Sequence, residues 1–175
     1  MRRFRFISYV ATAFFAIGLS TSCNTVDRSA ENHKAIVQRF WDEVWNKGNL
    51  AAADEICAAN YTDHGPAIAD VTTSLEGLKQ VVTRYRNAFP DLQLTIDDVV
   101  AVGDKVVTRW TGRGTHKGEL MGIAPTEKQA QVMGISIYRL AGGKIEESWT
   151  SWDRMDLMQQ LGAAPQQQSP SGDPN

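Results

Sequence analysis

The chain carries its apolar residues with two different periods. Up to residue 89 they recur at helical spacing, as in Ile36, Val37, Phe40, Trp41 and Val44. This spacing predicts helices at about 30–45, 49–57 and 75–89, the last of which ends at Pro90. From residue 92 onward apolar and polar residues alternate, which is the period of a strand with one buried face.

The alternating region predicts strands joined by hairpins. They lie at about 92–102, 106–115 and 129–140, and a fourth strand follows the Gly142-Gly143 turn. A short helix, RMDLMQQL, closes the domain. Helices followed by hairpin-linked strands are typical of an α+β fold with an antiparallel sheet. We expect the helices to lie across a curved sheet, leaving a cone whose open end is a pocket for a small hydrophobic molecule.

Both ends of the chain have the composition of segments outside a folded domain. Residues 1–22 combine three arginines, an apolar run and small residues, the layout of a secretory signal peptide. Cys23 follows in a context that resembles a bacterial lipobox, so lipidation of Cys23 and simple cleavage nearby are both open. We expect 23–29 to be a linker, 30–161 the domain and 162–175 a disordered tail. The protein is then periplasmic, or attached to the cell-envelope membrane through Cys23.

Charge and cysteine content limit the partners further. Removal of residues 1–22 leaves 15 basic and 20 acidic residues, a net charge of −5. This balance argues against a nucleic-acid partner, which requires a basic face. Cys57 is the only cysteine besides Cys23, so a chain whose Cys23 is lipidated or removed forms no internal disulfide. The helical apolar position of Cys57 favours a packed thiol over a nucleophile.

Strand parity places the candidate carboxylates. In the last strand one face is shared by Ile145, Glu147, Trp149, Ser151 and Asp153. If this face is the inner one, Glu147 and Asp153 point into the pocket, where burial raises a carboxyl pKa and suits it to proton transfer. Each also has a structural interpretation: Asp153 as the N-cap of the closing helix, and Glu147 as the ion-pair partner of Arg139.

Parity on the neighbouring strands adds further candidates. Trp110 shares a face with His116, and Met133 shares one with Arg139, so we expect these four side chains to face the pocket. A bulge at Gly112 or Gly114 would reverse the side of His116. His116 and His64 are candidate acid/base groups, because a histidine titrates near neutral pH. Simple exposure, at a strand end for His116 and at a turn for His64, is the alternative.

Motifs for other chemistries are absent from the sequence. It has no glycine-rich phosphate loop, no CxxC pair, no HExxH and no nucleophile elbow. Its histidines, His33, His64 and His116, are widely scattered. We therefore expect neither a metal site nor a cofactor.

Two runs together resemble the SnoaL-like polyketide cyclases, also called ester cyclases. They are AFPDLQLTIDDVVAVGDKVVTRWTGRGTHKGELMGIAPTEKQ and GISIYRLAGGKIEESWTSWDRMDLMQQLG, and the resemblance extends from the first predicted helix to Leu161. It implies the nuclear transport factor 2-like fold, a cone-shaped α+β barrel that often forms homodimers through its sheet. The chain departs from the usual P-T-G-K loop at Glu127, which stands where the family has glycine.

The resemblance also implies an activity. In the characterised cyclases an acidic residue near the end of the last strand enolises a polyketide ester, and the ring closes without metal or cofactor. Asp153 is at the matching position, and His64 and His116 fall at motif positions that line the pocket. The leading hypothesis is acid/base chemistry, such as aldol-type cyclisation, on a small hydrophobic carbonyl or ester compound. A non-catalytic, exported ligand-binding domain is the alternative, and an envelope interaction module with a filled pocket is the third hypothesis.

Overall fold

The computed structural model describes residues 22–65 and 70–163, with side chains from residue 28 onward. The signal peptide predicted at 1–22 and the tail predicted at 162–175 therefore lie almost wholly outside the described residues, and both stay predictions, as does lipidation of Cys23. The first helix begins at Ser22 and includes the segment 23–29, whose role as a linker stays a prediction. None of the helices in the described ranges is both long and apolar enough to cross a membrane.

The helices form close to their predicted positions. They are α1 (Ser22–Arg39), which continues into the π-helical segment η1 (Phe40–Asn46), then α2 (Leu50–Ile56), α3 (Leu75–Ala88) and α4 (Arg154–Leu161). The N–H groups of a helix's first turn have no partner inside the helix, and side chains accept hydrogen bonds from them in α3 and α4. Ser74 accepts a hydrogen bond from Gly77 N at the start of α3, and Asp153 accepts one from Asp156 N at the start of α4.

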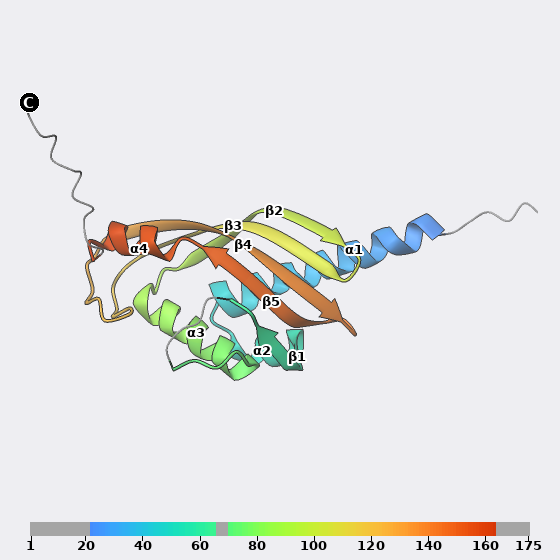
Figure 1. The fold of residues 1–175 in the computed structure, drawn as a ribbon, viewed down its shortest axis with the longest axis horizontal. Coiled ribbons are helices and arrows are strands. Elements are labelled where there is room, and N and C mark those ends of the chain that lie inside the picture. Colours follow the sequence, from blue (N-terminus) through green and yellow to red (C-terminus); the bar gives the residue numbers. More distant parts are fainter. Residues whose placement is uncertain (1–21, 66–69, 164–175) are drawn as a thin grey trace, which may run out of the picture.

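Five strands form one sheet (Figure 1). They are β1 (Cys57–Asp63), β2 (Gln93–Val102), β3 (Lys105–Thr115), β4 (Gln129–Ala141) and β5 (Lys144–Trp152). Their order is β1-β5-β4-β3-β2, and every pair is antiparallel except β1 with β5. The predicted α+β fold is confirmed. The sheet differs from the expected one in being mixed and open, since β1 and β2 are its two edges.

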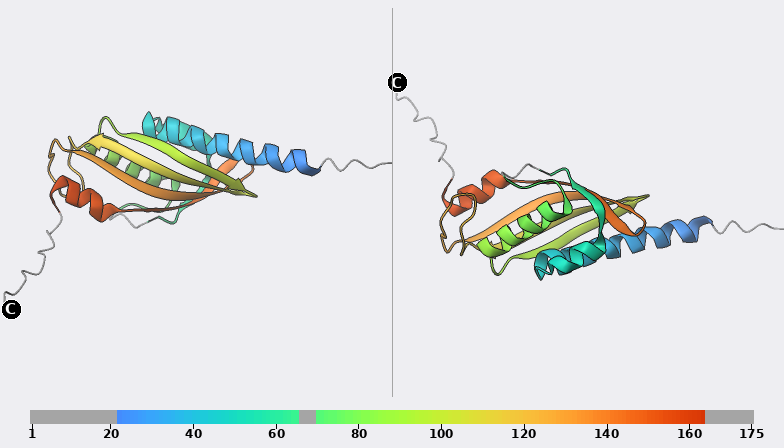
Figure 2. Two further views of the ribbon diagram at one scale, coloured as in Figure 1. Left: turned by 90° about the horizontal axis from the view of Figure 1, so that it is seen from above. Right: turned by 90° about the horizontal axis from the view of Figure 1, so that it is seen from below.

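The core lies between the helices and the concave face of the sheet, as the two views in Figure 2 show. Aromatic residues dominate it: the Trp41 ring packs 5.5 Å from the Trp110 ring, and Phe40 meets Tyr138 edge to face at 5.8 Å. A second apolar cluster joins the end of α3 to α4 through Phe89 and Leu157. The sheet, the helices packed on its concave face and α4 at one end therefore surround one interior space.

A β-bulge in β5 decides which of its side chains face that space. Arg139 on β4 pairs with Glu147, whereas the next residue, Leu140, pairs with Ile145, so Glu146 is an extra residue in β5. The extra residue inverts the alternation that follows it. Ile145 and Ser148 are both buried on the inner face.

The turn around Glu127 keeps a conformation that normally selects glycine. Glu127 has a φ of 57°, in the left-handed region, which costs a residue with a Cβ roughly 1–2 kcal/mol. Its backbone N–H donates to the carbonyl of His116, which ties the turn to the end of β3. Glu127 therefore adopts the left-handed conformation that glycine would accept more readily.

One buried hydroxyl in β3 offers a test of the packing. Thr108 is fully buried, and its Oγ1 has no hydrogen-bond partner among the described residues. A buried unpaired hydroxyl is destabilising, so Thr108→Val, which keeps the shape, is expected to raise the free energy of unfolding by about 1 kcal/mol. Urea unfolding measures the change, with Thr95→Val on the exposed side of β2 as the control. A lower stability of Thr108→Val would contradict the assigned environment.

Candidate functional site

A cavity of about 140 Å³ lies between the helices and the concave face of the sheet. Its walls are mostly apolar and include seven aromatic residues: Trp41, Trp45, Tyr85, Phe89, Trp110, Tyr138 and Trp152. The volume is close to that of a protein cavity of roughly 150 Å³ that holds benzene. Walls of this kind with a few polar groups are typical of sites for small apolar ligands.

Asp63 is the one carboxylate among the described residues that line the cavity. Arg154 lies on the same wall, whereas Arg113 reaches the cavity edge from the outer face of β3, where its side chain is exposed. The Arg154 guanidinium lies 5.9 Å from the centre of the Trp152 ring, a cation–π contact, and Arg113 Nε donates to Gln131 Oε1. The cavity therefore combines apolar walls with one acidic group and one cation, Arg154.

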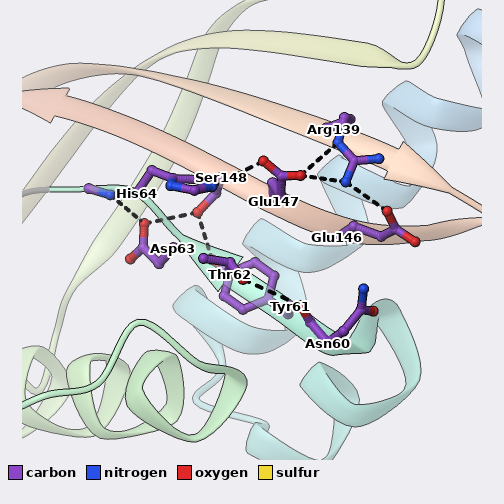
Figure 3. A network of polar contacts seen from close by, with 10 residues as sticks. Asn60, Tyr61, Thr62, Asp63, His64, Arg139, Glu146, Glu147 and Ser148 are labelled. Carbon is purple, nitrogen blue, oxygen red and sulfur yellow. Dashed lines mark hydrogen bonds and ion pairs between the residues drawn. The ribbon is translucent and has the colours of Figure 1, made fainter.

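Asp63 is held in place by a hydrogen-bond network between β1 and β5 (Figure 3). Its Oδ1 accepts from Gly65 N at 2.8 Å and from Ser148 Oγ at 3.1 Å. The Tyr61 hydroxyl lies 2.6 Å from the same Ser148 Oγ, and burial raises the pKa of Tyr61 well above its usual value. Among the described residues no hydrogen bond reaches Asp63 Oδ2, which leaves that oxygen able to accept a proton from a ligand.

Hydroxyl and indole groups form a second polar feature of the cavity. Trp110 Nε1 donates to Ser136 Oγ at 3.0 Å, and Ser136 Oγ lies 2.9 Å from Thr150 Oγ1. Trp41 Nε1 is buried and has no hydrogen-bond partner among the described residues. Burial raises the pKa of Tyr138, an effect that Ser136 and Trp41 partly offset. These five side chains all line the cavity, and we call them the donor cluster.

The predicted inward face of β5 is wrong after the bulge. Glu147 and Trp149 lie on the outer face, away from the cavity, whereas Thr150 and Trp152 line it. The predicted pairing of Arg139 with Glu147 is confirmed, with Arg139 Nε donating to Glu147 Oε1 at 3.0 Å. Arg139 also pairs with Glu146 at 2.8 Å, so it contacts both carboxylates at the bulge (Figure 3).

Asp153 and His64 also lie outside the cavity lining. Asp153 is exposed, and its Oδ1 accepts from Asp156 N at 2.8 Å, so its structural interpretation as a helix N-cap is confirmed. His64 stacks on the outer-face Trp149 at 4.7 Å, and its Nε2 lies 3.0 Å from Glu147 Oε2. The expectation that these two residues face the pocket is wrong, because the bulge inverts β5 and because His64 follows the last residue of β1. No observation tests their catalytic roles directly.

The parity predictions on β3 and β4 had opposite outcomes. Trp110 faces the cavity as predicted, because β3 pairs with β4 without a bulge. Met133 and Arg139 do not, since the inner positions of β4 are Ser136 and Tyr138, and Met133 is 61% exposed on the outer face. Met133 was grouped with Arg139 by parity, and both were assigned to the wrong side.

His116 is on the inner side of the sheet, as expected, but is not among the cavity-lining residues. It is fully buried at the end of β3. Its Nδ1 lies 3.1 Å from Thr126 Oγ1, its ring packs on Phe89, and its Nε2 has no partner among the described residues. Burial lowers its pKa, and Glu127 only partly opposes this. The neutral imidazole is therefore the form that the fold favours.

The buried His116 predicts an acid-sensitive stability. Because its pKa is lower in the folded chain than the value of about 6.5 in an unfolded one, the unfolded chain binds the proton first as pH falls. Stability is then fully present above pH 6.5 and declines below it, by about 1.4 kcal/mol per unit of pKa lowering. Urea unfolding between pH 7.5 and 5 measures the decline, which is expected to be smaller in His116→Gln. An equal slope in both proteins would contradict the prediction.

Two other features of the described structure are not part of the candidate site. Burial raises the pKa of the Cys57 thiol to about 12, so the prediction of a packed thiol is confirmed. A polar groove of about 330 Å³ lies beside the cavity, but its groups bond one another: Gln160 pairs with Gln131, and Asp91 with Thr115. Within the described residues no cluster of His, Cys, Asp or Glu could hold a metal ion, and cofactor independence stays a prediction.

Several site residues were not predicted from the sequence. Asp63 lies in NYTDHGP, a segment for which we considered only the histidine. Thr150 and Trp152 were assigned to the outer face. One signal in the sequence could have indicated the correct face: Glu146 and Glu147 are adjacent polar residues in a strand of alternating pattern. In the structure both lie opposite Arg139, where they form the β-bulge.

Helices packed on a curved sheet enclose an apolar cavity with one carboxylate among its described lining residues, an arrangement typical of sites for small ligands. The SnoaL-like polyketide cyclase model matches residues 35–161, so the chain belongs to this family. The nuclear transport factor 2-like fold that the resemblance implied is confirmed. No curated protein matches the sequence.

Solved structures give the same relationship. A candidate polyketide cyclase from Acidithiobacillus ferrooxidans is 35% identical, with a TM-score of 0.68 over 76% of this chain and 96% of that one. IdmH, a candidate polyketide cyclase from Streptomyces antibioticus, is 30% identical (TM-score 0.66, 74% and 98% covered). AclR, a candidate hydroxylase from Streptomyces galilaeus, is 26% identical (TM-score 0.69, 78% and 88% covered). Proteins named for different reactions therefore share this architecture.

Proposed function

We propose that the protein performs cofactor-independent acid/base chemistry on a small hydrophobic carbonyl or ester compound bound in the aromatic cavity. The observation that carries this proposal is Asp63, the lining carboxylate whose Oδ1 is fixed by two hydrogen bonds. A positioned carboxylate in an apolar cavity is suited to remove a proton from the carbon next to a carbonyl group. Asp63 takes the place that the resemblance assigned to Asp153.

The chemical step needs only groups of this chain and the substrate. Asp63 Oδ2 takes the α-proton, and the electrons of the broken C–H bond form the enolate C=C bond while charge moves to the carbonyl oxygen. In an aldol-type cyclisation the enolate carbon then bonds to a second carbonyl carbon of the same molecule. The resulting alkoxide takes the proton back from Asp63, so the carboxylate is regenerated and no oxidant or reductant is required.

Proton exchange tests the proposal without knowledge of the natural substrate. In D2O, enolisation replaces the α-hydrogens of a ketone by deuterium, which ¹H NMR detects as loss of the α-CH2 signal. We expect the protein to accelerate this exchange in 1-tetralone, a fused-ring aromatic ketone. If aromatic ketones bind without any acceleration, the enzyme proposal fails and the binding-domain alternative replaces it. That alternative is favoured by one observation, the use of Asp153 as an exposed helix cap.

Export, attachment to the membrane through Cys23 and homodimer formation through the sheet stay predictions. The chemistry proposed for the cavity does not depend on any of the three.

A further inference from the structure

We propose that the donor cluster binds the carbonyl oxygen of the ligand, with the Thr150 hydroxyl as the group that donates to it. This inference deepens the proposed function and rests on it for the identity of the site. It specifies the ligand as a compound with an unprotonated carbonyl oxygen directed towards β4 and β5.

The cluster leaves a buried donor to which a ligand can bind. Each of its five side chains carries one N–H or O–H proton. Well-formed hydrogen bonds join Trp110 to Ser136 and Ser136 to Thr150, and Tyr138 lies close enough to Ser136 and Trp41 for both to lower its pKa. Buried donors without partners are costly. Trp41 Nε1 is such a donor: Trp41 is 97% buried, lines the same cavity and has no partner among the described residues. A carbonyl oxygen offers two lone pairs and no proton, so it is a suitable partner for a donor of this kind.

The chain of hydrogen bonds allows Thr150 to be the donor to the ligand. The Trp110 indole can only donate, so it fixes Ser136 Oγ as an acceptor. If Ser136 then donates to Thr150, the Thr150 proton is left for the ligand, and each bond polarises the next. Thr150 is half-buried and lines the cavity, whereas Ser136 is 1% exposed. Of the two hydroxyls, Thr150 is the one a ligand can reach.

The spacing between Thr150 and Asp63 matches an enolisable carbonyl group. Asp63 Oδ1 lies 3.1 Å from Ser148 Oγ, and Ser148 and Thr150 are two residues apart on the inner face of β5, which separates them by about 7 Å along the strand. A carboxylate acts on an α-carbon from about 3 Å, the α-carbon is about 2.4 Å from the carbonyl oxygen, and an O–H···O bond adds about 2.8 Å. These distances along a bent path span the gap between the two side chains.

A hydrogen bond from Thr150 to the carbonyl oxygen becomes stronger as negative charge develops on that oxygen during enolisation. It therefore stabilises the transition state more than the bound ketone. Removing the hydroxyl in Thr150→Val keeps the β-branched shape. It is expected to lower kcat for exchange by about 10- to 100-fold, less than the usual loss for an oxyanion-hole donor because the cluster has other donors. The KM is expected to change little.

A binding experiment tests the inference separately from turnover. The probes are 1-tetralone and tetralin, which share a skeleton and differ in the carbonyl oxygen. We expect the full-length wild-type protein to bind 1-tetralone about tenfold more tightly, the effect of one hydrogen bond, and to shift the C=O stretch of bound ¹³C-labelled ketone to lower frequency. Thr150→Val, with Ser136→Ala as a second variant, is expected to lose both effects and to keep its affinity for tetralin. Thr108→Val, which removes a buried hydroxyl outside the cavity lining, is the matched control.

Each outcome decides the question. Loss of the ketone preference and of the frequency shift in Thr150→Val but not in Thr108→Val supports the inference, even if no protein catalyses exchange and the proposed function fails. An unchanged preference and frequency in Thr150→Val and Ser136→Ala overturns it, even if exchange depends on Asp63. A wild-type protein with no preference for the ketone, or with affinity for neither compound, overturns it as well.

Discussion

Replacement of Asp63 by Asn is expected to slow α-proton exchange of 1-tetralone by about 10²–10⁴-fold, the usual contribution of a positioned general base. Asn is the same shape, and its carbonyl oxygen can still accept from Gly65 N and Ser148 Oγ, so the β1–β5 network is kept. The variant is therefore expected to fold and to bind the ketone with nearly unchanged affinity. ¹H NMR in D2O measures the exchange rate, and thermal shift measures binding.

Asp153→Asn is the matched control for this prediction. Asn is as good a helix N-cap as Asp, and Asp153 caps α4 from an exposed position outside the cavity lining. Its exchange rate is expected to stay near that of the wild type. If Asp153→Asn loses exchange and Asp63→Asn retains it, the position implied by the family resemblance carries the chemistry, and Asp63 is not the base.

A large loss of stability is expected from Gly134→Ala. A Cβ at Gly134 would lie 2.3 Å from Trp110 Cζ2 and 2.8 Å from Trp152 Cβ, closer than any real contact. Both tryptophans form walls of the cavity, so relief of the overlap requires movement of a large ring or of the backbone. We expect the free energy of unfolding to fall by about 2–3 kcal/mol, at the upper end for overpacking.

Urea unfolding measures this change, and Ile135→Ala provides the comparison. Ile135 is the next residue of β4 and is 50% exposed on the outer face, so its truncation is expected to cost much less. The packing predicts a second effect, a weakened affinity of Gly134→Ala for aromatic ligands, because the displaced ring reshapes the cavity wall. Wild-type stability in Gly134→Ala would show that Trp110 and Trp152 do not pack over β4 in this way.

The helices and the strand order of the hairpins were predictable from the sequence, because they depend on local signals. Apolar residues at helical spacing indicate α3, which begins at Leu75 after the Ser74 cap, and Gly142-Gly143 indicates the turn between β4 and β5. Both glycines have positive φ, which a side chain disfavours. The parallel pairing of β1 with β5 was not predicted, because strands far apart in the sequence pair through tertiary packing.

The candidate site was predicted less well, and one extra residue explains most of the difference. Strict alternation from Ile145 places Glu147 inside, but Glu146 is inserted opposite Arg139 and inverts every later position. Glu147 therefore forms ion pairs on the outer face, and Thr150 reaches the cavity. Asp63 was missed for another reason: its role depends on Ser148, a residue 85 positions away that only the fold brings within 3.1 Å.

The most direct test of the central claim is a crystal structure of the Asp63→Asn variant with bound 1-tetralone. The account predicts that the ketone occupies the aromatic cavity, with its α-carbon about 3–3.5 Å from the side chain of residue 63 and its carbonyl oxygen hydrogen-bonded to Thr150. A ketone bound against Asp153, or on the outer face beside His64 and Trp149, would contradict the assignment of Asp63 as the base and of the cavity as the site of the chemistry.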